Sequence, residues 1–174
     1  ILSINFSSAL STTCQSAAMA AKELEADYPE GKVIVIDSLC ASLGQGMLVY
    51  LTAREKAKGK SLEEVADFVR QTIPHLCHWF TVDDLNHLKR GGRVSAAAAL
   101  FGTMLQMKPV LHVDDEGRLI PVSKVRGRKA SIKALLDKME ELALDTETVF
   151  ISHGDCLEEV EEMAQSIRER FGTK

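Results

Sequence analysis

The sequence predicts an α/β protein, because segments patterned like buried strands alternate with segments patterned like helices. Val33–Ile36 is a continuous run of β-branched residues, as expected for a strand buried in a parallel sheet. Two further apolar segments flank the turn Asp114–Gly117 and predict a β-hairpin. In the first half, the order strand, helix, strand, helix is the βαβ pattern of a three-layer α/β/α unit.

The other elements are expected from periodicity and capping signals. Ser11 is the expected N-cap of the first helix, and Ser61 with Glu64 forms a capping box before the third. Pro74 marks an expected boundary. We expect helices at residues 12–28, 42–58, 62–72, 94–106, 129–143 and 157–170. We expect strands at residues 1–4, 33–36, 77–82, 108–113, 118–125 and 148–151.

Composition restricts the class of protein. The 174 residues are 45% hydrophobic and 26% charged, as in ordinary globular proteins. A net charge of −4 and a pI near 5.8 argue against a nucleic-acid-binding protein. No apolar run approaches the roughly 20 residues that span a bilayer, so we expect no integral membrane contact. Four widely spaced cysteines without a Cys-x-x-Cys pair are typical of reduced thiols in a cytoplasmic protein.

The stretch Asp83–Arg93 is the most informative part of the sequence. A short amphipathic turn with Leu85 and Leu88 on one side ends at two glycines, which allow positive φ angles and close approach of other groups. Arg93 follows this break and can bind an anion with its planar guanidinium group. The alanine-rich helix expected at residues 94–106 fits either an ordinary core helix or the wall of an apolar slot.

A hydroxyl-rich loop, Phe6–Ser11, lies between the first strand and the first helix. Free N–H groups and the helix dipole at such a position favour an anion. The alternative is that these serines and threonines only cap and turn the chain, and the residues alone favour it. Asp37 and Ser38 follow the next strand, where open α/β sheets place a ligand crevice, although they are equally expected to cap a helix.

Two candidate sites lie in the second half. Lys124, Arg126, Arg128 and Lys129 form either a solvated basic surface or a docking site for an acidic partner or a phosphate. His153 follows an expected strand and is a candidate for acid–base chemistry, with a structural role favoured. The cluster of two histidines and a cysteine at residues 75–78 lacks a second ligand pair, so we expect no metal.

These motifs together resemble the DegV family of fatty-acid-binding proteins. The resemblance rests on Ser7-Ser8-x-Leu-Ser11, on the Asp-Asp-Leu-x-x-Leu-x-x-Gly-Gly-Arg segment ending at Arg93, and on Lys124-Val-Arg126. It implies two α/β domains, at residues 1–75 and 76–174, the first with a truncated parallel sheet and the second with a mixed sheet. Thr12 stands where the family usually has glycine, and the family's Thr-Ser-Gln-Pro and His-x-Gly-Pro-Gly segments, near its N- and C-termini, are not in this sequence.

The resemblance also implies roles for residues. Ser8 is expected to hydrogen-bond the carboxylate of a long-chain fatty acid, with Arg93 as its cation, and Arg126 to contact the ATP-binding subunit of a fatty-acid kinase. Ala97, Leu100, Phe101 and Met104 are the expected wall of the acyl pocket. The expected function is to bury the acyl chain and present its carboxylate for acyl-phosphate formation, with no cofactor other than the bound lipid. The alternative is a hydrolase or transferase that uses a serine or His153, although no Gly-x-Ser-x-Gly segment is present.

Overall fold

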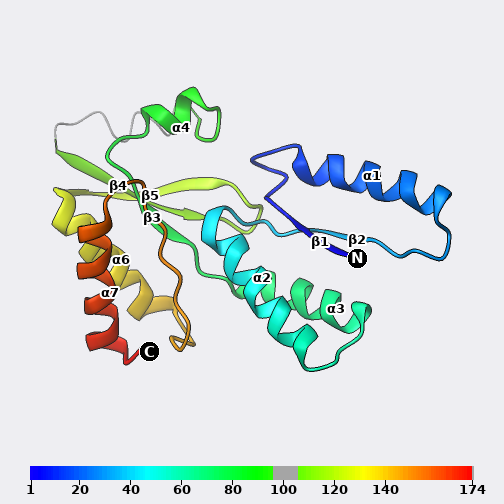
Figure 1. The fold of residues 1–174 in the computed structure, drawn as a ribbon. Coiled ribbons are helices and arrows are strands. Elements are labelled where there is room, and N and C mark those ends of the chain that lie inside the picture. The colour runs from blue at the N-terminus through cyan, green and yellow to red at the C-terminus, as the bar shows by residue number, and fades with distance from the viewer. Residues whose placement is uncertain (96–105, 174) are drawn as a thin grey trace. The chain divides into compact units, whose positions relative to one another are not determined.

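A computed structural model describes residues 1–95 and 106–173 and is drawn in Figure 1. The chain forms two compact units. The first comprises Ile1–Leu76 together with the hairpin turn Val113–Arg118, and the second comprises Cys77–His112 and Leu119–Lys174. The division into domains at residues 75 and 76 stays a prediction, because independent folding is not established by contacts alone.

The first unit contains a parallel sheet of β1 (Leu2–Asn5) and β2 (Ile34–Asp37), paired from Leu2 opposite Ile34 to Asn5 opposite Asp37. Helix α1 (Thr13–Asp27) connects the two strands and contacts both of them. Helices α2 (Ser42–Ala57) and α3 (Leu62–Thr72) follow, with a short 3-10 turn at Ile73–His75. Figure 1 shows α1 on one side of the strands and α2 and α3 on the other, which is the predicted α/β/α arrangement.

The core of this unit lies between the sheet and the last two helices. Ile36 of β2 packs with Leu48 of α2 and with Ala66 and Val69 of α3, all of them buried. The predicted capping box at the start of α3 is confirmed. The Glu64 N–H donates to the Ser61 hydroxyl over 3.3 Å, and the Ser61 N–H donates to the Glu64 carboxylate over 2.8 Å.

The second unit is built on a three-stranded sheet in the order β3 (Trp79–Thr81), β4 (Met107–Val113), β5 (Leu119–Arg126). Strands β3 and β4 are antiparallel, with Trp79 opposite His112, and β4 and β5 form the predicted hairpin. The mixed sheet expected here is wrong for the described strands, because both of its neighbouring pairs run antiparallel. The described helices are α4 (Asn86–Arg90), α6 (Arg128–Leu142) and α7 (Leu157–Phe171). Leu85 and Leu111 are buried in its core.

One expected strand does not form. Residues 148–151 have the composition of a strand but adopt irregular backbone. Strand formation depends on pairing and packing more than on residue type, and this segment joins no ladder among the described strands. Two residues before this segment, the Thr146 carbonyl accepts a 2.8 Å hydrogen bond from the Thr173 hydroxyl. Most of the helix expected at residues 94–106 falls outside the described residues.

Candidate functional site

The hydroxyl-rich loop and the segment after β2 meet at the carboxyl edge of the parallel sheet. The register that pairs Asn5 with Asp37 brings both strands to an end at the same level. Two backbone hydrogen bonds then join the segments: the Ser38 N–H donates to the Asn5 carbonyl over 3.1 Å, and the Ser7 N–H donates to the Cys40 carbonyl over 2.9 Å. The two segments are therefore held together at the edge of the sheet where open α/β sheets place their ligands.

Ser8 is exposed at this edge. Its backbone N–H donates to both oxygens of the Asp37 carboxylate, over 3.2 and 3.3 Å. Asp37 also accepts a 3.0 Å hydrogen bond from the Leu39 N–H, which fixes the carboxylate in place. Within residues 1–95 and 106–173, the Ser8 hydroxyl has no hydrogen-bond partner. The Ser8 hydroxyl can therefore donate to the acceptor of a ligand, while the Ser8 backbone is held by its hydrogen bonds to Asp37.

Three amides of the loop, at residues 9–11, are not free to bind an anion. The Ala9 N–H donates to the Ser7 hydroxyl, and the Leu10 and Ser11 N–H groups donate to the Ser7 carbonyl. The observed cap position of α1 is Thr12 rather than Ser11, although the Ser11 hydroxyl accepts from the Thr13 N–H over 3.2 Å. A ligand anion beside residues 9–11 would meet hydroxyl groups, since these three amides already have acceptors.

Two cysteines near Asp37 are poor nucleophiles. Burial, and secondarily the negative charge of Asp37, raise the pKa of the Cys14 thiol. Burial raises the pKa of Cys40 to about 11, with Asp37 adding to the effect and a hydrogen bond to Ser38 opposing it. Both thiols are protonated at neutral pH, and the thiolate is the form that attacks. This edge of the sheet is therefore suited to binding rather than to covalent thiol chemistry.

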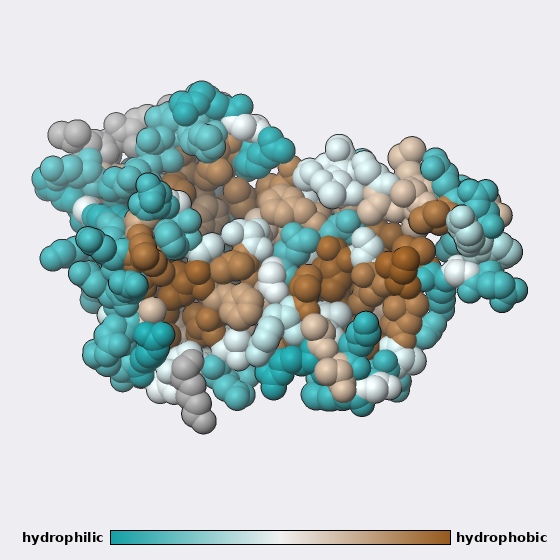
Figure 2. All heavy atoms as spheres, viewed as in Figure 1, coloured by the Kyte–Doolittle hydropathy of each residue, from teal (hydrophilic) through white to brown (hydrophobic). Residues whose placement is uncertain are grey.

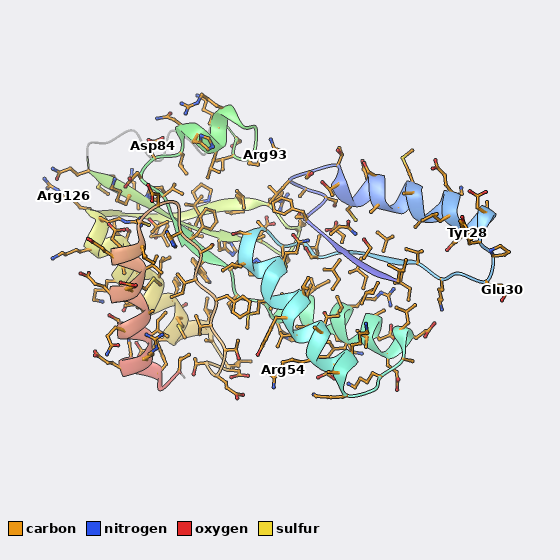
Figure 3. The ribbon with its side chains drawn as sticks, in the orientation of Figure 1. Tyr28, Glu30, Arg54, Asp84, Arg93 and Arg126 are labelled. Atoms are coloured by element: carbon orange, nitrogen blue, oxygen red, sulfur yellow. The ribbon has the colours of Figure 1, made fainter. Side chains whose placement is uncertain are left out.

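Arg93 lies just after α4 in the second unit, as Figure 3 shows, and it is exposed. Its N–H donates to the Leu88 carbonyl over 2.9 Å, and Gly92 has a φ of +73°, which closes the turn. The guanidinium donates through Nη1 to the Gly91 carbonyl. A guanidinium has five N–H donors, and residues 1–95 and 106–173 occupy only this one of them, which leaves the others for a ligand.

The segment before Arg93 is anchored at two points. The Leu85 side chain is buried against Leu111. The Lys108 ammonium group forms a 2.6 Å ion pair with Asp83, which lowers the pKa of that carboxyl. The pattern Asp-Asp-Leu-x-x-Leu therefore places a short helix on β4, and Arg93 follows it.

The structure separates the basic residues near the end of β5. Arg126 is exposed at the last position of the strand (Figure 3). Arg128, by contrast, is turned to α7, where it forms a 2.7 Å ion pair with Glu159.

His153 lies beside the start of α7. Its Nδ1 accepts a 3.2 Å hydrogen bond from the N–H of Cys156, the N-cap residue of that helix. This contact ties His153 to the start of α7, and whether His153 has a chemical role stays a prediction.

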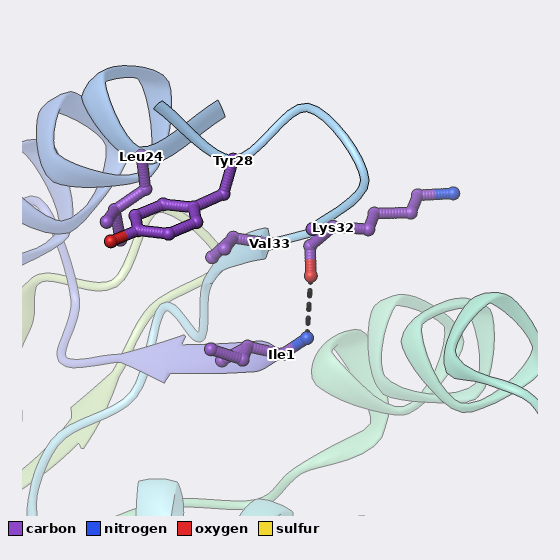
Figure 4. Close-up of a pocket in the computed structure, with 6 residues that line it drawn as sticks. Ile1, Leu24, Tyr28, Lys32 and Val33 are labelled. Atoms are coloured by element: carbon purple, nitrogen blue, oxygen red, sulfur yellow. Dashed lines mark hydrogen bonds between the residues drawn. The ribbon is translucent and has the colours of Figure 1, made fainter. Parts of the chain in front are cut away.

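A pocket that the sequence did not predict lies at the opposite end of β1. It has a volume of about 390 Å³. Figure 4 shows its lining, in which the backbone nitrogen of Ile1 donates to the Lys32 carbonyl over 2.6 Å. Figure 2 shows apolar atoms gathered around the first sheet on the face in view. The lining residues are Ile1, Leu24, Tyr28, Gly31, Lys32 and Val33.

The structure thus gathers some of the predicted residues and adds others. Ser8 is brought together with Asp37, Ser7 and Gly117 in the first unit. Arg93 and Arg126 belong to the second unit. The expected pocket-wall residues fall outside the described residues: Ala97, Leu100, Phe101 and Met104.

No group of three or more His, Cys, Asp or Glu side chains in the described ranges could hold a metal ion. No helix in those ranges is long and apolar enough to cross a bilayer.

Comparison with known proteins identifies the family. A family model described as "Uncharacterised protein, DegV family" matches residues 1–174. A DegV domain-containing protein of Clostridium perfringens is 45% identical over 176 residues, which cover 100% of this chain and 60% of the relative. The chain belongs to the DegV family. The chain spans about 60% of the length of that relative.

Two solved structures are similar to this DegV chain. A DegV family protein of Thermus thermophilus, described by its fatty acid binding, is 36% identical with a TM-score of 0.70, covering 84% of this chain and 50% of that one. The fatty acid kinase B3 protein of Streptococcus pneumoniae, loaded with linoleic acid, has a TM-score of 0.92 at 24% identity and covers 99% of this chain and 61% of that one. The predicted α/β fold of the DegV type is confirmed by this likeness.

Proposed function

We propose that this DegV chain binds a long-chain fatty acid and that Ser8 holds its carboxylate. The observation that carries the proposal is the exposed Ser8 hydroxyl, which has no partner in the described ranges although the amide beside it is held by Asp37. A hydroxyl at the carboxyl edge of a parallel sheet is a suitable donor for a carboxylate. The fatty acid binding described for the Thermus thermophilus relative supports the same ligand class.

Arg93 supplies the positive charge in this proposal. A carboxylate removed from water requires a charge-assisted partner, and the planar guanidinium group is suited to it. The acyl chain would then lie against apolar side chains, for which Ala97, Leu100, Phe101 and Met104 remain the predicted candidates. The ligand of the site is the lipid itself, and no further cofactor is proposed.

The proposed role is to bind and present the lipid, without catalysis by this chain. The ATP-binding subunit of a fatty-acid kinase would be the partner that phosphorylates the exposed carboxylate in the cytoplasm. Arg126 is the proposed contact with that subunit, since it is exposed at the end of β5 while the neighbouring Arg128 is paired with Glu159. The alternative of a hydrolase that uses His153 has less support, because Nδ1 of that residue already accepts a hydrogen bond from Cys156.

Isothermal titration of the full-length protein with palmitic acid tests this proposal. We expect saturable binding to the wild type, and Ser8→Ala should weaken it about tenfold, because a hydrogen bond to a charged group is lost. Ser16→Ala is the matched control. Ser16 is exposed on α1, its hydroxyl donates to the Thr12 carbonyl, and its removal should leave the affinity unchanged. Absence of binding to the wild type, or equal affinities of the Ser8→Ala variant and the wild type, would contradict the assignment.

A further inference from the structure

The side chain of Ser7 is fully buried beside Ser8, with 0% exposure. Its hydroxyl donates to the carbonyl oxygen of Gly117 over 2.9 Å and accepts from the Ala9 N–H over 3.2 Å. A hydroxyl has a single donor, so the donor of Ser7 is committed to Gly117 and is not available to a ligand. Ser7 therefore does not have the role proposed for Ser8, although the two residues are adjacent and chemically identical.

Gly117 fits closely against this hydroxyl. A Cβ atom at position 117 would lie 2.2 Å from the Ser7 Oγ and 3.1 Å from the Leu39 Cα, and the φ of Gly117 is +77°. Both the space and the backbone conformation therefore require glycine. The turn that carries it is firmly built, because the Gly117 N–H donates to the Asp114 carbonyl over 2.9 Å and the Arg118 N–H donates to the Asp114 carboxylate over 2.8 Å.

Gly117 therefore lies against two residues that hold the Ser8 backbone in place, Ser7 and Leu39. Ser7 precedes Ser8 in the chain. Leu39, which has a φ of +51°, donates its N–H to the same Asp37 carboxylate that holds the Ser8 N–H. All of these residues lie in the first unit, although Gly117 is 110 residues from Ser7 in sequence.

We infer that Ser7 and Gly117 are positioning residues that fix the Ser8 hydroxyl for recognition of the ligand carboxylate. The inference rests on the proposed function of Ser8 and adds a dependence of that site on the distant hairpin turn. Loss of the Ser7 hydroxyl frees the Gly117 carbonyl and the Ala9 N–H, so the loop can shift. A displacement of a fraction of an ångström is enough to weaken a hydrogen bond to a bound carboxylate.

A double-mutant cycle tests whether Ser7 acts through Ser8. The affinity of the full-length protein for palmitic acid is measured for the wild type, Ser7→Ala, Ser8→Ala and the double variant. We expect Ser7→Ala to weaken binding about tenfold in the wild-type background and less than about twofold in the Ser8→Ala background, since the bond that it positions is then already absent. Losses that multiply would mean that Ser7 acts independently of Ser8, and would overturn the inference.

A pair of glycine variants tests the turn. Gly59, like Gly117, lies in the first unit with a positive φ, here +85°, but a Cβ atom there would have nothing within 4 Å. Gly59→Ala therefore carries a similar backbone cost without the clash. We expect Gly117→Ala to weaken palmitic acid binding about as much as Ser7→Ala does, and Gly59→Ala to retain the wild-type affinity. Denaturant unfolding of each variant establishes that the folded protein is being compared.

The outcomes separate this inference from the proposed function. A wild type that does not bind palmitic acid overturns both. A wild type that binds, with equal affinities for Gly117→Ala and Gly59→Ala or with independent effects of Ser7 and Ser8, overturns the positioning role alone. If Gly117→Ala does not fold, the cycle of Ser7 and Ser8 still decides the question.

Discussion

Replacement of Arg93 by alanine is expected to lower the affinity for a long-chain fatty acid by roughly ten- to a hundredfold, which is the range for a lost charge-assisted hydrogen bond. Arg93 is exposed after α4, and its guanidinium uses one described hydrogen bond, to the Gly91 carbonyl. Arg93→Lys should recover part of the loss, because lysine keeps the charge but not the planar pair of donors. Titration calorimetry with palmitic acid measures both variants.

Arg90 provides the matched control for Arg93. It is an exposed arginine at the last position of α4, three residues earlier in the same segment. Arg90→Ala removes the same charge from nearly the same place, so a general electrostatic effect would appear in both variants. We expect the loss for Arg93→Ala alone. Equal losses for the two variants, or an unchanged affinity for Arg93→Ala, would remove Arg93 from the site.

Replacement of Leu85 by alanine is expected to lower the free energy of unfolding of the second unit by about 2–5 kcal/mol, the usual cost of truncating a buried leucine. Leu85 is 1% exposed and packs with Leu111, and Phe80, Val82 and Leu88 surround the pair. The cavity would lie directly below α4, so the segment that carries Arg93 should also lose order. Urea denaturation followed by circular dichroism measures the change.

Leu144 is the control for Leu85, because its side chain is 100% exposed. Leu144→Ala should change the free energy of unfolding by less than about 0.5 kcal/mol, as is usual for surface substitutions. A similarly small change for Leu85→Ala would contradict the packing of the Asp83–Arg93 segment against β4 described above.

The elements that were predicted correctly are those whose signals are local. The β-branched run at residues 33–36 forms β2, displaced by one residue. The turn Asp114–Gly117 connects β4 and β5 as the expected hairpin. Ser61 and Glu64 form the expected capping box, since each needs only a partner three residues away. These patterns specify hydrogen bonds and burial within a short window, so the sequence alone is sufficient to find them.

The errors arise where several local solutions compete or where the partner is distant. Ser11 lies one residue before the observed cap position, Thr12, and its hydroxyl accepts from the N–H of Thr13, the first residue of α1. Residues 148–151 resemble a strand, yet pairing decides whether a strand forms. The hydrogen bond between Ser7 and Gly117 joins residues 110 positions apart, so no short sequence pattern predicts it. Family resemblance indicates Ser8, and its place at the end of a strand indicates Asp37. The hydrogen bonds between the two residues are visible only in the structure.

The central claim is that the protein carries a long-chain fatty acid, and mass spectrometry of an organic extract of the purified full-length protein tests it most directly. Because the carboxylate is held by Ser8 and Arg93 in this account, we expect close to one fatty acid per protein molecule. The Arg93→Ala variant, purified in parallel, should yield much less. An extract of the wild-type protein that contains no fatty acid, from a sample whose intact mass and folding are correct, would contradict the account.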